Sequence, residues 1–299
     1  MSILEVKKEC FPEVQAGLSS RGAYLANHWY GHQDILLKYA GFSPQLALYA
    51  KLQIGWQTGK NMGLDGEQGF KEVVKIQKLP FFVWDSKRLK LAESQGMTWG
   101  HAIGAPFLYK DIKEYNGTKI SSAIAFPSHS IPEYEIKSGW EEFAEDFVLW
   151  TKAMGLEATV CLHPNDYLNE EVRSTLACLE VTCCGSLFYI DYLQRFADLV
   201  RAHEVVVVNK ASSPMFYAAA LGKPVYCRGK LPITEPIHPD EPLIDCDPAW
   251  IQKNFPWTIN GSNGVESALA ELGDACRLSK DGMVELLNKS KDDDGAFID

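Results

Sequence analysis

Two hydroxyl side chains in the second half of the chain have the chemistry and the setting of an anion site. Ser212 and Ser213 lie between a run of four valines, residues 205–208, and Pro214, which precedes an apolar helix predicted over 215–221. A proline fits the first turn of a helix because the N–H that it lacks would be unpaired there. Two hydroxyls beside the free N–H groups of a helix start suit an anion, most simply a phosphate.

Two histidines nearer the N-terminus are further candidates for contact with such a ligand. His163 is followed by Pro164, and proline disfavours helical geometry in the residue before it, so we expect the imidazole to face a ligand crevice. The alternative is a histidine whose ring is satisfied by a neighbouring carbonyl. His129 lies between Ser128 and Ser130, and this segment is either a ligand contact or a structural turn.

The elements that must position these residues alternate regularly. Apolar strands are predicted over 120–126, 156–162, 179–184, 205–208 and 225–227, and helices over 139–154, 168–178, 189–202 and 215–221. This alternation predicts a doubly wound parallel sheet, and ligands of such sheets bind beyond the carboxyl ends of the strands. The candidates expected at that edge are Ser128, His129, Ser130, His163, Pro164, Gly185, Ser186, Ser212 and Ser213.

The first half is less regular but similar in kind, with strands predicted over 47–54, 80–84 and 101–104 and a helix over 86–95. We therefore expect an α/β protein with two Rossmann-like domains and a nucleotide crevice between them. The predicted parts are an acceptor-side domain at 1–115, a nucleotide-binding domain at 116–245, C-terminal helices that pack back at 246–289, and a disordered tail at 290–299.

Composition narrows the class of protein. The 299 residues carry a formal net charge of −10 and a pI of about 5.3, which argues against nucleic acid as the main partner. No apolar run approaches the roughly 20 residues of a membrane span. Charges in the first residues do not fit a signal peptide, so we expect a cytoplasmic protein.

The order and strand-end placement of these motifs resemble the GT-B glycosyltransferases that build bacterial surface polysaccharides. The pair His163-Pro164 followed by Ser212-Ser213 is similar to the HP and SS motifs of sialyltransferases and Kdo transferases, which use CMP-activated sugars. The stretch FYAAALGKPV at 216–225 resembles the helix and strand after the SS motif in capsule and O-antigen (lipopolysaccharide) enzymes. The segments at 51–57 and 102–109 resemble N-domain segments of such enzymes.

The resemblance implies that His163, Ser212 and Ser213 hold the nucleotide phosphate and ribose and that neither a metal nor another cofactor is required. It leaves the general base open. Those families carry an acidic pair followed by glycine, whereas this chain has only Asp65 before Gly66, in a segment that also reads as an ordinary turn. A Gln-His-Gly-like segment of related enzymes is matched here by a sequence with Ile54 in place of the histidine. The remaining candidates for the base are His28, His32, His129, Glu133 and Glu135.

The resemblance thus implies a glycosyltransferase that moves a nonulosonic or ulosonic acid from a CMP donor to a glycan or lipid-linked acceptor of the cell surface. A peripheral position at the inner membrane is compatible with this role, and the oligomeric state is left open. Two alternatives remain: a UDP-sugar transferase or UDP-sugar 2-epimerase of the same fold, and a non-catalytic subunit that binds nucleotide sugars or glycans.

Overall fold

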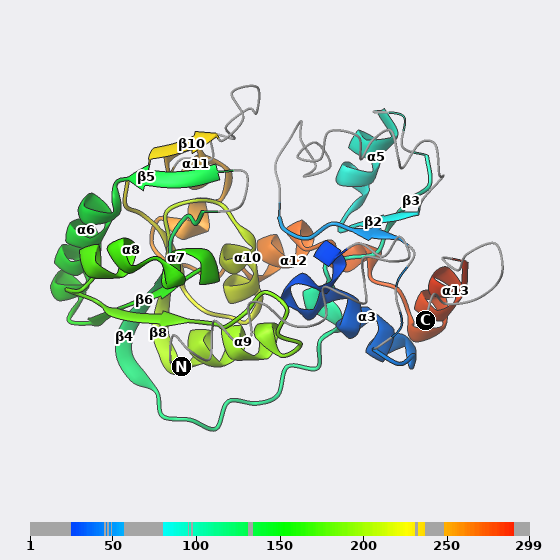
Figure 1. Cartoon of the computed structure of the whole chain (residues 1–299), viewed down its shortest axis with the longest axis horizontal. Coiled ribbons are helices and arrows are strands. Elements are labelled where there is room, and N and C mark those ends of the chain that lie inside the picture. Colours follow the sequence, from blue (N-terminus) through cyan, green and yellow to red (C-terminus); the bar gives the residue numbers. More distant parts are fainter. Residues whose placement is uncertain are drawn as a thin grey trace. The chain divides into compact units, whose positions relative to one another are not determined.

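A computed structural model of the chain describes residues 25–44, 46, 48, 50–56, 80–94, 96, 98–130, 134–230, 233–236 and 248–289 (Figure 1). These residues form two compact units. Unit 1 contains the described residues within Lys113–Ser186 and Gln194–Ala268. Unit 2 contains the described residues up to Ile112, the segment Leu187–Leu193, and the described residues from Leu269 onward. The domain limits given by the sequence remain a prediction.

Unit 1 is built on a five-stranded sheet in which every pair of neighbouring strands is parallel. The strand order is β7-β6-β4-β8-β9. The bounds are β4 Ile120–Phe126, β6 Glu157–Leu162, β7 Glu180–Cys183, β8 His203–Val208 and β9 Val225–Cys227. The valines of β8 are buried, as expected for a strand covered on both faces. The predicted α/β class with a parallel sheet is confirmed.

The helices of unit 1 follow the strands in alternation. They are α6 Trp140–Met154, α7 Pro164–Leu168, α8 Glu170–Thr175, α9 Tyr192–Ala202, α10 Ser213–Ala220 and α11 Pro248–Asn254, with the 3-10 turn η3 Pro256–Thr258. The helix predicted over 168–178 is confirmed in part, because α8 lies within this range but is shorter, and the separate helix α7 before it was not predicted. The Asn169 backbone is extended, and its side chain accepts hydrogen bonds from the first turn of α8, so it ends one helix and caps the next.

A small antiparallel pair completes unit 1 and was not predicted. β5, Tyr134–Ser138, pairs with β10, Ile233–Pro236. The two strands lie far apart in the sequence, so no local turn signal joins them as a hairpin.

Unit 2 contains a three-stranded parallel sheet in the order β1-β2-β3, with bounds Lys51–Leu52, Phe81–Val83 and Gly100–Ala102. Its helical elements are η1 Leu25–Gly31, α3 His32–Ala40, α5 Ser86–Ser94, η2 Pro106–Tyr109, η4 Asp274–Cys276 and α13 Lys280–Lys289. The helix α12, Val265–Glu271, ends unit 1 and begins the C-terminal part of unit 2. None of the helices described has the length and apolar character needed to cross a membrane.

Among the described residues of the strand predicted over 47–54, only Lys51–Leu52 form a strand, β1, at the edge of this sheet. A buried side chain bonds to this edge. The Asn27 amide donates to the Ala50 carbonyl at 2.6 Å, and its oxygen accepts from the Leu52 N–H at 2.9 Å. These two bonds satisfy backbone groups that a further strand would otherwise pair.

Candidate functional site

The strand order of unit 1 reverses direction between β4 and β8, which is where the general rule for α/β sheets expects a ligand. From β4 the chain goes to β6 and β7 on one side, then crosses to β8 and β9 on the other. Figure 1 shows β4, β6 and β8 within this sheet. Where the direction of winding reverses, the loops after the two neighbouring strands separate, and ligands of α/β proteins bind there. The loop after β4 is Ser128–Ser130, and the loop after β8 is Asn209–Ser212.

Asn209 fixes one side of this edge. Its side chain is fully buried, and its oxygen accepts from the Ser128 N–H at 2.8 Å and from the Ser128 hydroxyl at 3.2 Å. Its amide donates to the Lys230 carbonyl at 3.2 Å, in the loop after β9. One side chain therefore ties together the ends of three strands, and the hydroxyl of Ser128 is already used in this bond.

Asp166 fixes the other side of the same loop. It is 3% exposed, and its carboxylate accepts from the Ser130 N–H at 3.0 Å. The Ser130 hydroxyl accepts from the Ile136 N–H at 3.1 Å, and the Asn165 amide approaches the Ser130 carbonyl at 3.4 Å. The loop after β4 is thus held between α7 and β8, with its histidine in the middle.

This arrangement brings His129 against His163. The two rings are nearly parallel, with centroids 4.0 Å and planes 10° apart. His129 Nδ1 lies 3.1 Å from the Ser130 carbonyl, so we assign the proton to Nδ1 and leave Nε2 as an acceptor. His163 Nδ1 accepts from the Asn165 N–H at 3.4 Å, which leaves its proton on Nε2. The stacked pair therefore offers one donor and one acceptor.

The electrostatics of the pair favour neutral rings. Burial and then the neighbouring His129 hold the pKa of His163 well below its usual range. Burial also lowers the pKa of His129, and the Lys210 ammonium acts in the same direction, against the Ser130 carbonyl and the Asp166 carboxylate. Two imidazolium rings in face-to-face contact would repel each other, so protonation of one ring disfavours protonation of the other.

The two serines after β8 lie at the start of α10 and are both partly exposed. Ser212 is at the N-cap position with an extended backbone, yet its side chain makes no capping bond. Gly185 and Ser186 follow β7, one strand beyond His163. Gly185 has a φ of 100°, which a residue with a side chain rarely adopts, and Ser186 is fully buried.

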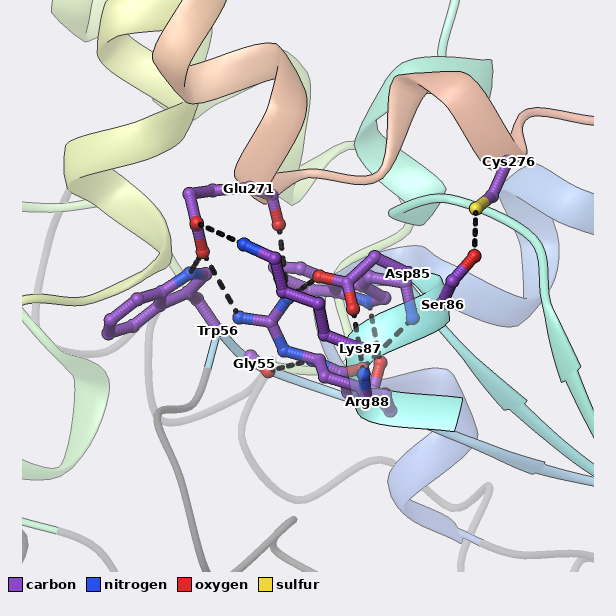
Figure 2. Close-up of polar contacts among 10 residues, drawn as sticks. Gly55, Trp56, Asp85, Ser86, Lys87, Arg88, Glu271 and Cys276 are labelled. Atoms are coloured by element: carbon purple, nitrogen blue, oxygen red, sulfur yellow. Dashed lines mark hydrogen bonds and ion pairs between the residues drawn. The ribbon is translucent and has the colours of Figure 1, made fainter. Parts of the chain in front are cut away.

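The carboxyl ends of the unit 2 strands carry a second polar cluster, shown in Figure 2. Arg88 forms an ion pair with Asp85, and its guanidinium lies 3.5 Å from the Glu271 carboxylate. The Trp56 indole donates to the same carboxylate at 2.8 Å, and the Lys87 ammonium lies 3.8 Å from it. The charges in this cluster compensate one another, so we interpret it as a brace between α5, the loop after β1 and α12.

The remaining candidates for the catalytic base lie in unit 2 or have side chains outside the described residues. His32 begins α3 in unit 2 and is fully buried, and His28 lies one turn before it with Nδ1 3.7 Å from the Asp34 carboxylate. Asp65, Glu133 and the side chain of Glu135 lie outside the described residues. Within the part of the chain that is described, no group of three or more His, Cys, Asp or Glu residues is arranged to hold a metal.

Two residues that organise the edge of unit 1 were missed by sequence reasoning. Asn209 directly follows the four valines, and a polar residue at that point of a buried strand was a usable signal. Asp166 lies two residues after Pro164, and its role depends on a contact with the loop after β4. No local pattern predicts such a contact between loops.

The sequence matches no protein-family model and no curated protein. Similar solved structures include a provisionally assigned UDP-N-acetylglucosamine 2-epimerase from Listeria monocytogenes, with 13% identity over 79% of this chain and a TM-score of 0.42. They also include a mutant of TarM from S. aureus in complex with fondaparinux, alpha-GlcNAc-glycerol and UDP, with 11% identity over 77% of this chain and a TM-score of 0.37. The chain spans 60% of the first protein and 44% of the second. Similarity at this level assigns neither an activity nor a ligand to this chain.

Proposed function

We propose that the chain is a glycosyltransferase whose nucleotide-sugar donor binds at the carboxyl edge of the unit 1 sheet. The observation that supports this most is the stacked pair of His129 and His163 beside the reversal of strand order. Ser212, Ser213 and the start of α10 follow the neighbouring strand β8, so hydroxyls and imidazoles converge on one edge.

The protonation states of the two rings give each a role toward a nucleotide. The Nε2–H of His163 would donate to a phosphate oxygen, and the free Nε2 of His129 would accept from a hydroxyl. Hydrogen bonds from neutral donors stabilise a phosphate without adding a full charge, and the nearby Lys210 would supply that charge. These contacts would grow stronger as the leaving phosphate gains charge in the transition state.

In the proposed reaction an acceptor hydroxyl attacks the anomeric carbon of the donor sugar. The bond between that carbon and the phosphate oxygen breaks, and the nucleotide leaves with the bonding electron pair. The hydroxyl proton passes to a base, for which His129 Nε2 and the carboxylates of Asp65 and Glu133 remain candidates. The acceptor is proposed to be a surface glycan or a lipid-linked glycan.

The proposed donor is a CMP-linked ulosonic or nonulosonic acid, on the strength of the HP and SS motifs. A UDP-sugar uses the same phosphate contacts and is the main alternative. Thermal unfolding with CMP, UDP and GDP separates them, since a ligand at 100 times its Kd stabilises the folded state by about 2.7 kcal/mol. Stabilisation by CMP alone supports the proposed donor, and stabilisation by UDP alone replaces it with the alternative.

Turnover tests the activity itself. Incubation of the purified chain with the stabilising donor should release free nucleotide when a glycan acceptor is added. Conversion of UDP-N-acetylglucosamine to another sugar without acceptor identifies an epimerase instead. Nucleotide binding with neither reaction identifies a binding subunit.

A further inference from the structure

The two stacked histidines of unit 1 differ in how well their hydrogen bonds tolerate a second proton. His163 Nδ1 accepts from the Asn165 N–H at 3.4 Å, at the start of α7. A proton on this nitrogen would turn the acceptor into a donor and bring two donors face to face. We therefore expect His163 to stay neutral as long as the folded chain holds this contact.

His129 has the opposite arrangement. Its Nδ1 lies 3.1 Å from the Ser130 carbonyl and carries the proton, so a second proton binds at Nε2. Protonation there leaves the contact with Ser130 in place, as well as the bond from the Ser130 N–H to the Asp166 carboxylate at 3.0 Å. Of the two rings, His129 is the one whose local hydrogen bonds survive protonation.

The charges that face His129 come from the elements on either side of its loop. The Asp166 carboxylate of α7 favours the imidazolium form, and the Lys210 ammonium in the loop after β8 opposes it. A protonated His163, at the end of β6, would oppose it as well. Burial is the largest effect and holds the pKa of His129 below its usual range, so the ring is neutral in the free protein at pH 7.5.

Both rings can be reached from solvent. His129 and His163 are partly exposed, in contrast to Asp166, which is 3% exposed. A ligand at the carboxyl edge therefore has access to ring atoms, and the rings can exchange protons with water. An opposite charge within about 4–6 Å favours the charged form of a titratable group. A phosphate beside the stacked pair adds such a charge to the set around His129.

We propose that nucleotide binding at this edge is coupled to the uptake of one proton at Nε2 of His129. The proposal rests on the proposed function, because it requires the nucleotide phosphate beside the stacked pair. The proton comes from solvent and no bond of the nucleotide breaks. His163 keeps its neutral Nε2–H as a donor, and the pair takes up one proton at most, because two imidazolium rings with centroids 4.0 Å apart repel each other.

The coupling gives nucleotide affinity a pH dependence of known sign. The pKa of His129 is higher in the complex than in the free protein, so affinity increases as the pH falls through the pKa of the complex. It levels off below the pKa of the free protein. One proton changes the affinity by at most about tenfold per pH unit.

Calorimetric titration with CMP and with UDP measures the uptake directly. Each titration is run at pH 7.5 and 6.5 in PIPES and in ACES, because two buffers that release different heat on losing a proton reveal how many protons the complex takes up. The phosphate of the nucleotide itself titrates with a pKa of about 6 and contributes equally in wild type and in His129→Gln. The difference between these two proteins therefore reports the ring.

We expect the wild type to take up more of a proton than His129→Gln, by up to one proton per bound nucleotide, and its affinity to rise more steeply as the pH falls. His101→Gln in β3 of unit 2 is the matched control and should behave like the wild type. Binding without a difference between wild type and His129→Gln contradicts the proton uptake and leaves the proposed donor site intact. Absence of binding in the wild type refutes both.

Nuclear magnetic resonance of wild-type protein labelled with ¹⁵N-histidine identifies the ring without a substitution. In the complex both ring nitrogens of His129 should be protonated, and His163 should keep one unprotonated nitrogen. Protonation of His163 in place of His129, or of neither ring, would overturn the proposal.

Discussion

The rings of His129 and His163 stack with their centroids 4.0 Å apart and their planes within 10° of parallel. The two residues follow neighbouring strands, β4 and β6, and the contact exists because Asp166 holds the loop that carries His129. The stacking contact is stable when both rings are neutral and is opposed by repulsion when both are protonated, so it should be sensitive to pH.

Stability should fall as the pH is lowered. The folded-state pKa values of both rings are lowered, so below about pH 6.5 the unfolded chain binds more protons than the folded one. The stabilising contribution is complete above pH 6.5 and is lost as the pH falls toward the folded pKa values. The melting temperature should therefore decrease between pH 7.5 and 5.5, and it should decrease less in a His163→Asn variant.

Burial also lowers the pKa of His32, His101 and His203, so some pH dependence remains in that variant. An identical slope in the wild type and in His163→Asn would show that the folded state does not hold the stacked rings neutral.

Asn209 should be a stability hotspot. Asn209→Ala removes three hydrogen bonds, two to the buried Ser128 and one to the Lys230 carbonyl. Urea unfolding should show a loss of about 2–4 kcal/mol. Asn116→Ala at an exposed loop position is the control and should stay within about 0.5 kcal/mol. Equal behaviour of the two variants would refute the anchoring role.

The brace in unit 2 makes a separate prediction. Arg88 is 8% exposed, and Arg88→Met would leave the buried Asp85 carboxylate without this cation, while Glu271 would keep only the Lys87 ammonium at 3.8 Å. Removing one partner of a buried ion pair costs about 3–5 kcal/mol. Lys87→Met is the neighbouring control, because the Lys87 side chain is 88% exposed and such pairs contribute about 0–1 kcal/mol. Urea unfolding of the two variants measures the difference.

Alanine substitutions at two glycines with nearly the same φ angle separate the cost of backbone strain from the cost of a steric clash. Gly31 has φ 71° and Gly155 has φ 70°, but a Cβ would lie 2.6 Å from the Ile190 carbonyl oxygen at Gly31 and would meet no atom within 4 Å at Gly155. In both alanine variants the left-handed backbone costs about 1–2 kcal/mol of stability. Gly31→Ala should cost about 1–3 kcal/mol more by thermal or urea unfolding. Similar losses in both would mean that residues 187–190 do not enclose the turn that joins η1 to α3.

Most of unit 1 could be predicted because its strands are apolar runs bounded by polar turns. The run of valines in β8, the apolar stretch of β4 and the helix that follows Ser212 all have strong local signals. The short helix α7 was missed because five residues that begin with a proline carry little helical periodicity. The pair of β5 and β10 was missed because the strands are distant in sequence.

From the sequence, the candidate site could be predicted only as a set of polar residues at the carboxyl ends of strands. The placement of His163 and His129 at neighbouring carboxyl ends follows from the alternation of strands and helices. Their stacking does not, since it depends on Asp166 and Asn209 fixing one loop from two sides. In unit 2 His28 and His32 were noticed, but the burial of His32 cannot be read from sequence.

Nucleotide binding to variants of His163 tests the central claim most directly. The wild type, His163→Gln, His163→Asn and the control His101→Ala are titrated with CMP and UDP by calorimetry. The Gln side chain can present an amide donor near the position of Nε2, whereas the shorter Asn cannot. We expect affinity for the preferred nucleotide to fall about 10- to 100-fold in His163→Asn, to be partly restored in His163→Gln, and to stay unchanged in His101→Ala. Equal affinity in all four proteins would contradict a donor site at the carboxyl edge of unit 1.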